Sequence, residues 1–425
     1  MRENNKSGRA EICISRTGRS ALRYPPDPTD PTDPTDLSHR SYPSHPSSTS
    51  GCWRPFPRLQ SPRVSVVLAA MKLDFLPFDL RLKHKWAVAS GPQSGADQGR
   101  AAVVLLRLTD GPVVGWGEAP ATARYQETTA SIIAFLERVQ AEKLSFANLP
   151  AGMDYLEKLA PGNSSAKCAV NVALADGAAR LASQPLYDFL NLGFTEGKHL
   201  TSFSIGLDTP KKIREKVLEA GLFPVLKLKV GAAGDRKNLA ALREAAPLKT
   251  IRVDANEAWP AREEALRQIE WLAQDPHIEY IEQPMPATTP PQDLAWLKQR
   301  SPLPVFGDES YHHAGDAARC AECYHGVNIK LIKTGGIIQA VEALQAARRA
   351  GLKTMIGCMV ESSISTSAGA HLAELADCLD LDGNLLVRND PFTGLTVKNG
   401  ILSFAAAGEK FGLRVRPRKS DPFAS

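Results

Sequence analysis

Acids and lysines recur at the ends of short apolar segments in the second half of the chain. These segments lie at 226–229, 253–256, 281–284, 307–310, 328–330 and 380–382. Side chains two residues apart share one face of a β-strand, so Lys227 and Lys229 are expected to point together, as are Asp380 and Asp382. Three further carboxylates between lysines predict a divalent cation flanked by two bases. Such an arrangement suits the removal of a proton from carbon.

The three carboxylates are Asp254, Glu282 and Asp308, each at the end of a different predicted strand. A set of hard oxygen ligands without His or Cys favours Mg²⁺ or Mn²⁺ over zinc. Glu309 follows Asp308 directly and is expected to point to the opposite face, so Asp308 is the preferred ligand. Each acid alone could instead cap a helix or pair with a lysine, and the metal site is favoured because three of them end adjacent strands.

A lysine that acts as a base must be neutral, whereas its ordinary pKa is about 10.4. Burial, a bound cation and a neighbouring ammonium are all expected to lower the pKa of Lys229, which has Lys227 beside it. Lys330 follows a strand further along the chain and is expected to approach from the other side. Two bases on opposite faces of one carbon predict inversion at that carbon.

The alternation of apolar runs with amphipathic helices after residue 200 predicts a (β/α) barrel of the modified (β/α)₇β type. The strands are expected at 202–205, 225–230, 250–253, 280–282, 305–307, 327–331, 354–356 and 379–381. Helices are expected between them, for example at 210–220, 261–273, 336–350 and 363–375. A doubly wound sheet is the alternative, but the glycine-rich turn that should follow its first strand is missing.

Residues 71–195 predict an α+β capping domain, residues 196–390 the barrel, and residues 391–425 a segment that returns to the cap. In the cap, strands at 101–108 and 113–116 flank the turn Asp110-Gly111, and helices are expected at 127–144 and 166–182. Residues 1–70 repeat the triplet Asp-Pro-Thr and then become rich in Ser and Pro, which predicts a disordered extension. Met71 is a candidate for the true start.

The composition excludes several classes of protein. The 425 residues carry a formal charge of +5, but most of this positive charge lies in residues 1–70. The remainder is nearly neutral, so it is not expected to have a basic surface that binds nucleic acid. No apolar run is long enough to span a membrane. Seven scattered cysteines predict reduced thiols and a cytoplasmic protein. Cys320 and Cys323 are expected to be neighbours on a short helix, because no second pair follows at zinc-site spacing.

Further motifs are GWGEAP at 115–120, AKCAV at 166–170, NIKLIKTGGI at 328–337, GCMVES at 357–362 and DLD at 380–382. Together with the acids and lysines, they resemble the enolase superfamily, in its muconate-lactonizing subgroup, and most specifically the dipeptide epimerases. The resemblance covers about residues 71–415. It implies one Mg²⁺ per subunit, with Mn²⁺ as a substitute, a dipeptide substrate, and a homo-oligomer.

The resemblance also implies a role for each site residue. Lys229 and Lys330 would be the two bases, Lys227 would contact the substrate carboxylate, Asp254, Glu282 and Asp308 would hold Mg²⁺, Ser204, Cys358 and Val360 would border the substrate, and Asp380 and Asp382 would hold its free ammonium. The expected activity is inversion of the Cα of the C-terminal residue of a dipeptide, by a two-base 1,1-proton transfer through an enediolate.

The identity of the dipeptide stays open at this point. Glutamate-specific members carry an arginine in the cap loop, whereas this chain has Gln93 near that place, and Lys83 or Lys85 could substitute for it. A cycloisomerase or dehydratase-type lyase on the same scaffold is the alternative activity. It is disfavoured because two inward carboxylates would then lack the ammonium that compensates them. A non-catalytic binding protein is the third reading, disfavoured because every expected base and ligand is present.

Overall fold

The computed structural model describes residues 71–89, 98–419 and 421–423. The predictions for residues 1–70 and for Gln93 lie outside these residues, and a start at Met71 stays a prediction. Within the described part of the chain, no helix is both long and apolar enough to cross a bilayer.

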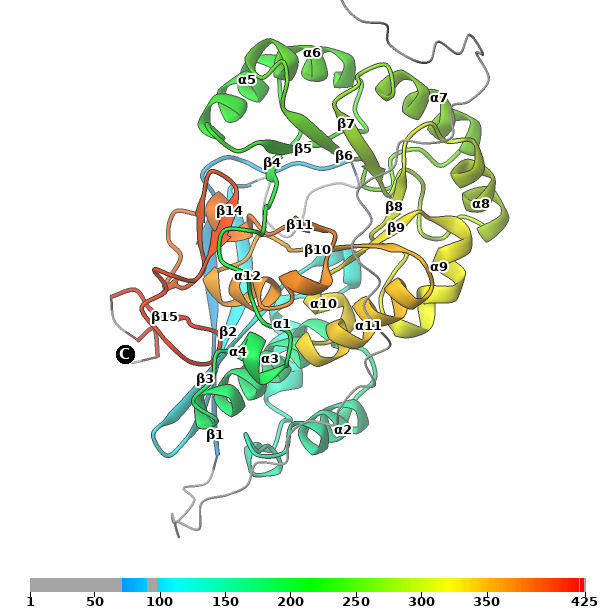
Figure 1. Ribbon diagram of the computed structural model, residues 1–425. Coiled ribbons are helices and arrows are strands. Elements are labelled where there is room, and N and C mark those ends of the chain that lie inside the picture. The colour runs from blue at the N-terminus through cyan, green and yellow to red at the C-terminus, as the bar shows by residue number, and fades with distance from the viewer. Residues whose placement is uncertain (1–70, 90–97, 420, 424–425) are drawn as a thin grey trace, which may run out of the picture. The chain divides into compact units, whose positions relative to one another are not determined.

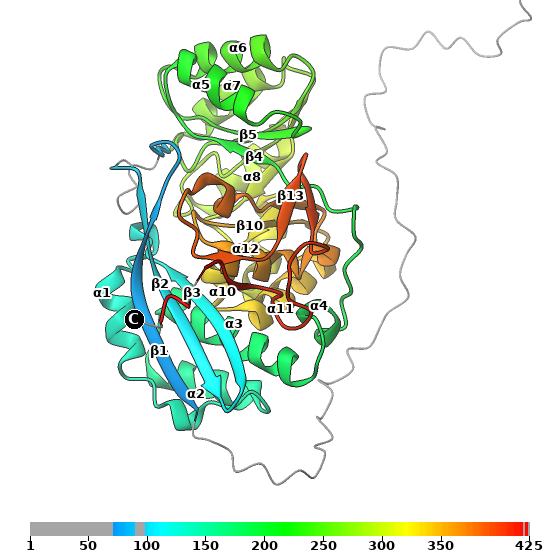
Figure 2. The same cartoon turned by 90° about the vertical axis from the view of Figure 1, so that its left-hand side faces the viewer.

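The cap is a three-stranded antiparallel sheet covered by helices (Figures 1 and 2). Its strands are β1 (Lys72–Arg81), β2 (Arg100–Asp110) and β3 (Val113–Pro120), and its helices are α1 (Thr129–Leu136), α2 (Leu149–Leu159), α3 (Ser164–Leu181) and α4 (Leu186–Phe189), with 3₁₀ turns η2 (Ala123–Tyr125) and η3 (Ala141–Lys143). The alanine-rich α3 packs so closely on β3 that a Cβ at Gly115 would lie 2.0 Å from the carbonyl oxygen of Ala173. Only glycine permits this approach.

The helix expected at 127–144 is shorter than predicted. Its regular part ends at Leu136, and Glu127 precedes it. The carboxylate of Glu127 accepts the backbone N–H of Ser165 at 3.0 Å, at the start of α3. A carboxylate is favourable at a helix N-terminus, and this contact draws Glu127 into the cap interior.

The barrel is an eight-stranded parallel sheet in which the spatial order of the strands follows the chain. The strands are β4 (Phe203–Ile205), β5 (Val225–Lys229), β6 (Thr250–Asp254), β7 (Ile278–Glu282), β8 (Val305–Gly307), β9 (Gly326–Ile329), β10 (Lys353–Gly357) and β11 (Cys378–Asp380). The two end strands, β4 and β11, are joined by an isolated parallel bridge between Thr201 and Leu379. The barrel is therefore nearly closed, as predicted.

A helix lies in every connection between successive strands, on the outside of the sheet (Figure 1). These helices are α5 (Pro210–Glu219), α6 (Asp235–Ala245), α7 (Arg262–Leu272), α8 (Pro291–Arg300), α9 (Ala317–Cys323), α10 (Leu331–Thr334), α11 (Ile337–Arg349) and α12 (Ser363–Ala370), with 3₁₀ turns η4 (Ala314–Asp316) and η5 (Ala373–Leu375). A further 3₁₀ turn, η6 (Gly383–Leu386), follows β11. Lys330 follows β9 as the N-cap of α10 instead of ending the strand. Its backbone is still extended, with φ −120°.

Buried polar contacts join the cap to the barrel. Glu118 of β3 accepts the backbone N–H and the hydroxyl of Ser362, at 2.9 and 2.6 Å, at the start of α12. Asn171 of α3 accepts the backbone N–H of Ile337 at 2.9 Å, at the start of α11. Both contacts satisfy N–H groups that a helix leaves without partners. They fix the cap against the barrel next to the strand ends.

The last described elements are the short strands β12 (Phe392–Thr393), β13 (Thr396–Lys398), β14 (Ile401–Ser403) and β15 (Arg416–Pro417). Beyond them, Asp421 pairs with Arg107 of β2 at 2.5 Å, and the ring of Phe423 lies 6.0 Å from that of Trp116. The domain boundaries predicted at 195/196 and 390/391 stay predictions.

Candidate active site

A cavity of about 230 Å³ lies at the carboxyl ends of the barrel strands, beneath the cap. Its lining includes eight of the residues singled out in the sequence: Ser204, Lys227, Lys229, Lys330, Cys358, Val360, Asp380 and Asp382. Strands far apart in the chain bring them together, because all parallel strands end at the same rim. Their roles stay predictions, but the structure collects them around one space.

Lys229 and Lys330 reach this cavity from different walls. Lys229 ends β5 and Lys330 follows β9, and β6, β7 and β8 lie between these strands in the sheet. Their side chains are 10% and 12% exposed. Both ammonium groups are therefore largely desolvated yet open to the same cavity.

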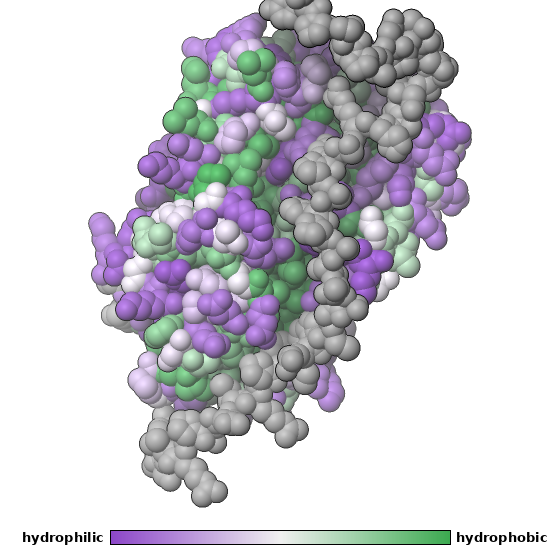
Figure 3. Space-filling model, viewed as in Figure 1, coloured by the Kyte–Doolittle hydropathy of each residue, from purple (hydrophilic) through white to green (hydrophobic). Residues whose placement is uncertain are grey.

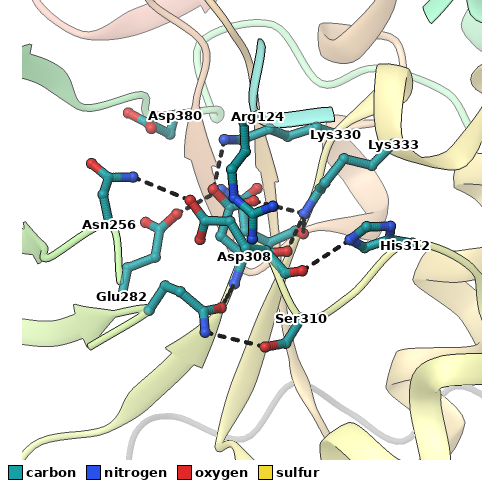
Figure 4. Close-up of polar contacts among 12 residues, drawn as sticks. Arg124, Asn256, Glu282, Asp308, Ser310, His312, Lys330, Lys333 and Asp380 are labelled. Atoms are coloured by element: carbon teal, nitrogen blue, oxygen red, sulfur yellow. Dashed lines mark hydrogen bonds and ion pairs between the residues drawn. The ribbon is translucent and has the colours of Figure 1, made fainter. Parts of the chain in front are cut away.

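The predicted metal ligands are more deeply buried than Lys229 and Lys330. Asp254, Glu282 and Asp308 are all 0% exposed. Asp254 contacts Lys229 at 2.6 Å and Glu282 contacts Lys227 at 2.7 Å. Asp308 contacts Lys330 at 2.6 Å (Figure 4). Each carboxylate thus touches a lysine of the cavity wall.

Lys227 occupies the centre of this charge network. Its Nζ lies 3.0 Å from Asp254, 2.7 Å from Glu282 and 2.7 Å from Asp380. Burial lowers the pKa of Lys227, but the three carboxylates outweigh burial and raise it well above its usual range. Lys227 is therefore a fixed positive charge at the floor of the cavity.

The pKa values of Asp254 and Glu282 shift in opposite directions in this charge network. Burial raises the pKa of Asp254, but Lys227 and Lys229 outweigh burial and lower it to about 2. Burial, together with Asp254, raises the pKa of Glu282 to about 7. Of the three predicted metal ligands, Glu282 contacts the fewest ammonium groups, and its pKa therefore lies nearest to neutral pH.

The acidic neighbours of Lys330 determine its pKa. Burial does lower its pKa, but Asp308, Tyr125 and Glu309 raise it well above the usual value. Pairing with Asp308 therefore outweighs desolvation in this arrangement.

The donor set suits a hard cation, although the side chains are not gathered around one. Among the described residues, no three His, Cys, Asp or Glu side chains form a cluster that could hold a metal ion. The Lys227 ammonium instead bridges Asp254 and Glu282. The buried oxygens Oε2 of Glu309 and Oδ1 of Asn256 accept no hydrogen bond from the described residues. Unpaired buried oxygens in a carboxylate cluster fit Mg²⁺ or Mn²⁺.

Glu309 does not point away from the site, contrary to the sequence-based expectation. It lines the cavity beside Lys330, and its Oε1 accepts Asn256 Nδ2 at 3.4 Å. The expectation failed because β8 ends at Gly307, and strand alternation no longer applies two residues later. Burial, together with Asp308, raises the pKa of Glu309 to about 8.

Lys333 is a site residue that the sequence analysis missed. Its side chain is fully buried, and its Nζ donates to Oδ1 of Asp308 at 2.6 Å, to the Asp308 carbonyl at 2.5 Å and to the Asn328 carbonyl at 2.8 Å (Figure 4). Oδ2 of Asp308 faces Lys330 instead. Lys333 therefore fixes the orientation of the Asp308 carboxylate. The spacing of Lys330 and Lys333, one helical turn apart, was the available signal.

Replacing Lys333 with methionine should lower the free energy of unfolding by about 3 kcal/mol, because it removes one partner of a buried ion pair. Urea unfolding followed by circular dichroism measures this change. Lys353→Met is the matched control, since Lys353 is 61% exposed in its pair with Asp377, and it should change stability by less than about 1 kcal/mol. Equal stability of Lys333→Met and the parent would show that the pair does not hold Asp308.

Asp380, which ends β11, and Asp382, which follows it, differ in their surroundings. Asp380 uses both oxygens, accepting Ser202 Oγ at 2.6 Å and Lys227 Nζ at 2.7 Å. Asp382 accepts the backbone N–H of Ser204 at 2.6 Å. Burial, together with Asp380, raises the pKa of Asp382 to about 7. Asp382 is therefore the acid of this pair with spare capacity for a cation.

Three residues of the cap side were also missed, because contacts between distant segments leave no local pattern. Trp86, Arg124 and Tyr125 line the cavity opposite the strand ends. Lys83 and Lys85 are exposed and do not belong to the described residues that line the cavity. The suggestion that one of these lysines replaces a cap-loop arginine stays a prediction.

Cys320 and Cys323 lie on α9, away from the cavity lining. Their thiols donate to the carbonyl groups of Ser310 and Pro291. They are neighbours on a short helix, as predicted.

A capped, nearly closed parallel barrel with lysines and carboxylates at its rim is the architecture of the enolase type. Two family models match the chain, the mandelate racemase/muconate lactonizing enzyme N-terminal domain at residues 84–191 and the enolase C-terminal domain-like family at residues 209–397. The chain belongs to this mandelate racemase/muconate lactonizing branch of the enolase superfamily.

Among similar curated proteins is the L-Ala-D/L-amino acid epimerase of Pedosphaera parvula, 61% identical over 82% of this chain and 100% of its own length. The L-Ala-D/L-Glu epimerase of Bacteroides thetaiotaomicron is 39% identical over 78% of this chain and 84% of its own length.

Solved structures are similar as well. The substrate-liganded L-Ala-D/L-Glu epimerase of Bacillus subtilis superposes with a TM-score of 0.74 at 28% identity, over 81% of this chain and 98% of its own. The dipeptide epimerase of Enterococcus faecalis, complexed with Mg and L-Leu-L-Tyr, gives a TM-score of 0.72 at 28% identity, over 82% of this chain and 99% of its own.

Proposed function

We propose that this protein is a Mg²⁺-dependent dipeptide epimerase that inverts the Cα of the C-terminal residue by a two-base 1,1-proton transfer. The observation that carries the proposal is the placement of Lys229 and Lys330 on different walls of one cavity, with buried carboxylates beneath them. The relatives named as epimerases support it. We further propose that the protein is cytoplasmic.

The chemistry follows from where the lysines lie. A substrate Cα between them would lose its proton to the neutral amine of one lysine, leaving the C–H electron pair delocalised into the adjacent carboxylate as an enediolate. The ammonium of the other lysine would then donate a proton to the opposite face, forming a new C–H bond of inverted configuration. Neither oxidant nor reductant is required, and the two lysines exchange protonation states in each turnover.

Asp254, Glu282 and Asp308 would hold the Mg²⁺, with Mn²⁺ as a substitute. When bound, the cation would supply positive charge beside the enediolate oxygens and compensate the carboxylates that otherwise keep the lysines protonated. Lys227 would pair with the substrate carboxylate, and Lys333 would keep Asp308 oriented.

Asp382 would hold the free ammonium of the dipeptide, while Asp380 would fix Lys227 and complete the acid pair. Ser204, Cys358 and Val360 would border the substrate. This acid pair distinguishes an epimerase from a cycloisomerase or dehydratase-type lyase, whose substrates carry no ammonium to compensate buried carboxylates.

Asp382→Asn should raise the KM for a dipeptide about 10- to 100-fold, because it removes a charged hydrogen-bond acceptor for the ammonium. Steady-state polarimetry measures the change. Asp293→Asn is the control, since Asp293 pairs with Arg262 on the surface, and its KM should equal that of the parent. An unchanged KM in Asp382→Asn would show that Asp382 does not bind the ammonium of the dipeptide.

A homo-oligomer is also part of the proposal. Leu218, Leu222 and Leu248 are 65%, 76% and 76% exposed. On the face of the molecule drawn in Figure 3, apolar residues lie among polar ones at the surface. In a homo-oligomer, contact between copies of the chain would bury exposed apolar side chains such as these. Light scattering of the purified chain tests this proposal directly, and a monomer mass would contradict it.

The function as a whole is tested by incubating the protein and Mg²⁺ with a dipeptide library in D₂O and detecting deuterium at Cα by mass spectrometry. Mg²⁺-dependent uptake with formation of the second epimer is expected. Turnover of ammonium-free acids without uptake into any dipeptide would contradict the proposal.

A further inference from the structure

Arg124 brings a positive charge from the cap into the wall of the cavity. It lies on η2, between β3 and α1, and lines the cavity together with Tyr125. Its side chain is 39% exposed, and Figure 4 shows it reaching toward the acids and lysines of the barrel. It is therefore accessible to a molecule bound there.

Glu257 holds the guanidinium of Arg124 in one orientation. Nε and Nη2 of Arg124 donate to the two carboxylate oxygens of Glu257, both at 2.8 Å. Oε1 of Glu257 also accepts the backbone N–H of Ala287 at 2.7 Å. This bidentate geometry fixes the plane of the guanidinium. Nη1 makes no hydrogen bond to the residues that the structure describes.

Glu257, which pairs with Arg124, has a strained backbone conformation. Its φ is +68°, a left-handed conformation that a non-glycine residue adopts only when the surrounding structure enforces it. The Glu257 carboxylate contacts Arg124 of the cap and the backbone N–H of Ala287 in the barrel domain at the same time. Glu257 therefore presents Arg124 to the cavity.

The bound dipeptide determines which of its groups would meet Arg124. This step rests on the proposed function. The substrate carboxylate would lie near Lys227, its Cα between Lys229 and Lys330, and its ammonium at Asp382. The side chain on Cα then has to extend toward the cap, where Arg124 and Tyr125 lie.

We propose that Arg124, presented by Glu257, determines specificity by binding a side-chain oxygen of the residue that is epimerised. The substrate class is then dipeptides whose C-terminal residue ends in a carboxylate or a primary amide. Because Glu257 already compensates the charge of Arg124, the guanidinium acts as a hydrogen-bond donor and accepts glutamine as well as glutamate. A methionine side chain of similar length leaves the donor unpaired and is disfavoured.

The test compares kcat and KM for L-Ala-L-Glu, L-Ala-L-Gln and L-Ala-L-Met. The parent should prefer the first two over the third by about 10-fold or more. Arg124→Met should abolish this preference, raising KM for the Glu and Gln dipeptides about 10- to 100-fold and improving the Met dipeptide. Glu257→Gln should shift the Glu/Gln ratio toward Glu, because the charge of Arg124 is then uncompensated.

Arg262→Met is the matched control, since Arg262 pairs with Glu263 and Asp293 outside the cavity lining, and its selectivity should equal that of the parent. A Glu/Met ratio unchanged by Arg124→Met, or a parent that prefers L-Ala-L-Met, would overturn the inference while leaving the epimerase intact. Absence of epimerisation with every dipeptide would instead overturn the proposed function.

Discussion

Lys330→Ala should lower the rate of epimerisation by about 10²- to 10⁴-fold, because it removes the only base proposed for one face of Cα. Lys229 would still remove the proton from the other face. In D₂O, the variant should therefore exchange the Cα proton of one epimer and leave the other epimer protiated. Nuclear magnetic resonance of each purified epimer measures this exchange.

Lys229→Ala provides the mirror-image control, with exchange confined to the opposite epimer. Both lysines line the cavity from different strands, so the two variants should have complementary patterns. Equal residual exchange of both epimers in either variant would contradict the assignment of one base to each face.

Glu282→Gln should raise the dissociation constant for Mg²⁺ by about 100-fold or more and reduce turnover in parallel. Even residues that only orient a metal ligand change metal affinity 10- to 100-fold, roughly, so loss of a ligand charge should have at least that effect. Calorimetric titration of Mg²⁺ measures affinity independently of activity. The substitution keeps the shape of the side chain and its contact with Asn328, so the variant is expected to fold.

Glu279→Gln is the matched control on the same strand. Glu279 is 27% exposed and pairs with Arg252, and it is outside the cavity lining. Its Mg²⁺ affinity should be unchanged. If Glu282→Gln bound Mg²⁺ as tightly as the parent, Glu282 would not be a ligand.

Chelation with EDTA should abolish the activity of the parent, and added Mg²⁺ should restore it.

Strand positions and inward-facing residues could be predicted well from local pattern. β5 was expected at 225–230 and spans Val225–Lys229, with Lys227 and Lys229 on the cavity side. A strand fixes the face of each side chain by simple alternation, and parallel order places the strand ends at one rim. These two rules suffice to bring Lys229 and Lys330 to one cavity.

The rules failed where a strand had already ended. Glu309 was assigned to the wrong face because it lies beyond β8, and Lys333 was overlooked because it belongs to the short helix α10. Arg124 escaped notice because its partner Glu257 is 133 residues away in the chain.

A single-turnover reaction of the parent protein in D₂O tests the transfer of a proton across Cα most directly. The two-base mechanism predicts that the first product molecules carry deuterium at Cα, whichever epimer is the substrate. Product that retains the original proton in the first turnover would mean that one base serves both faces, and would contradict the account.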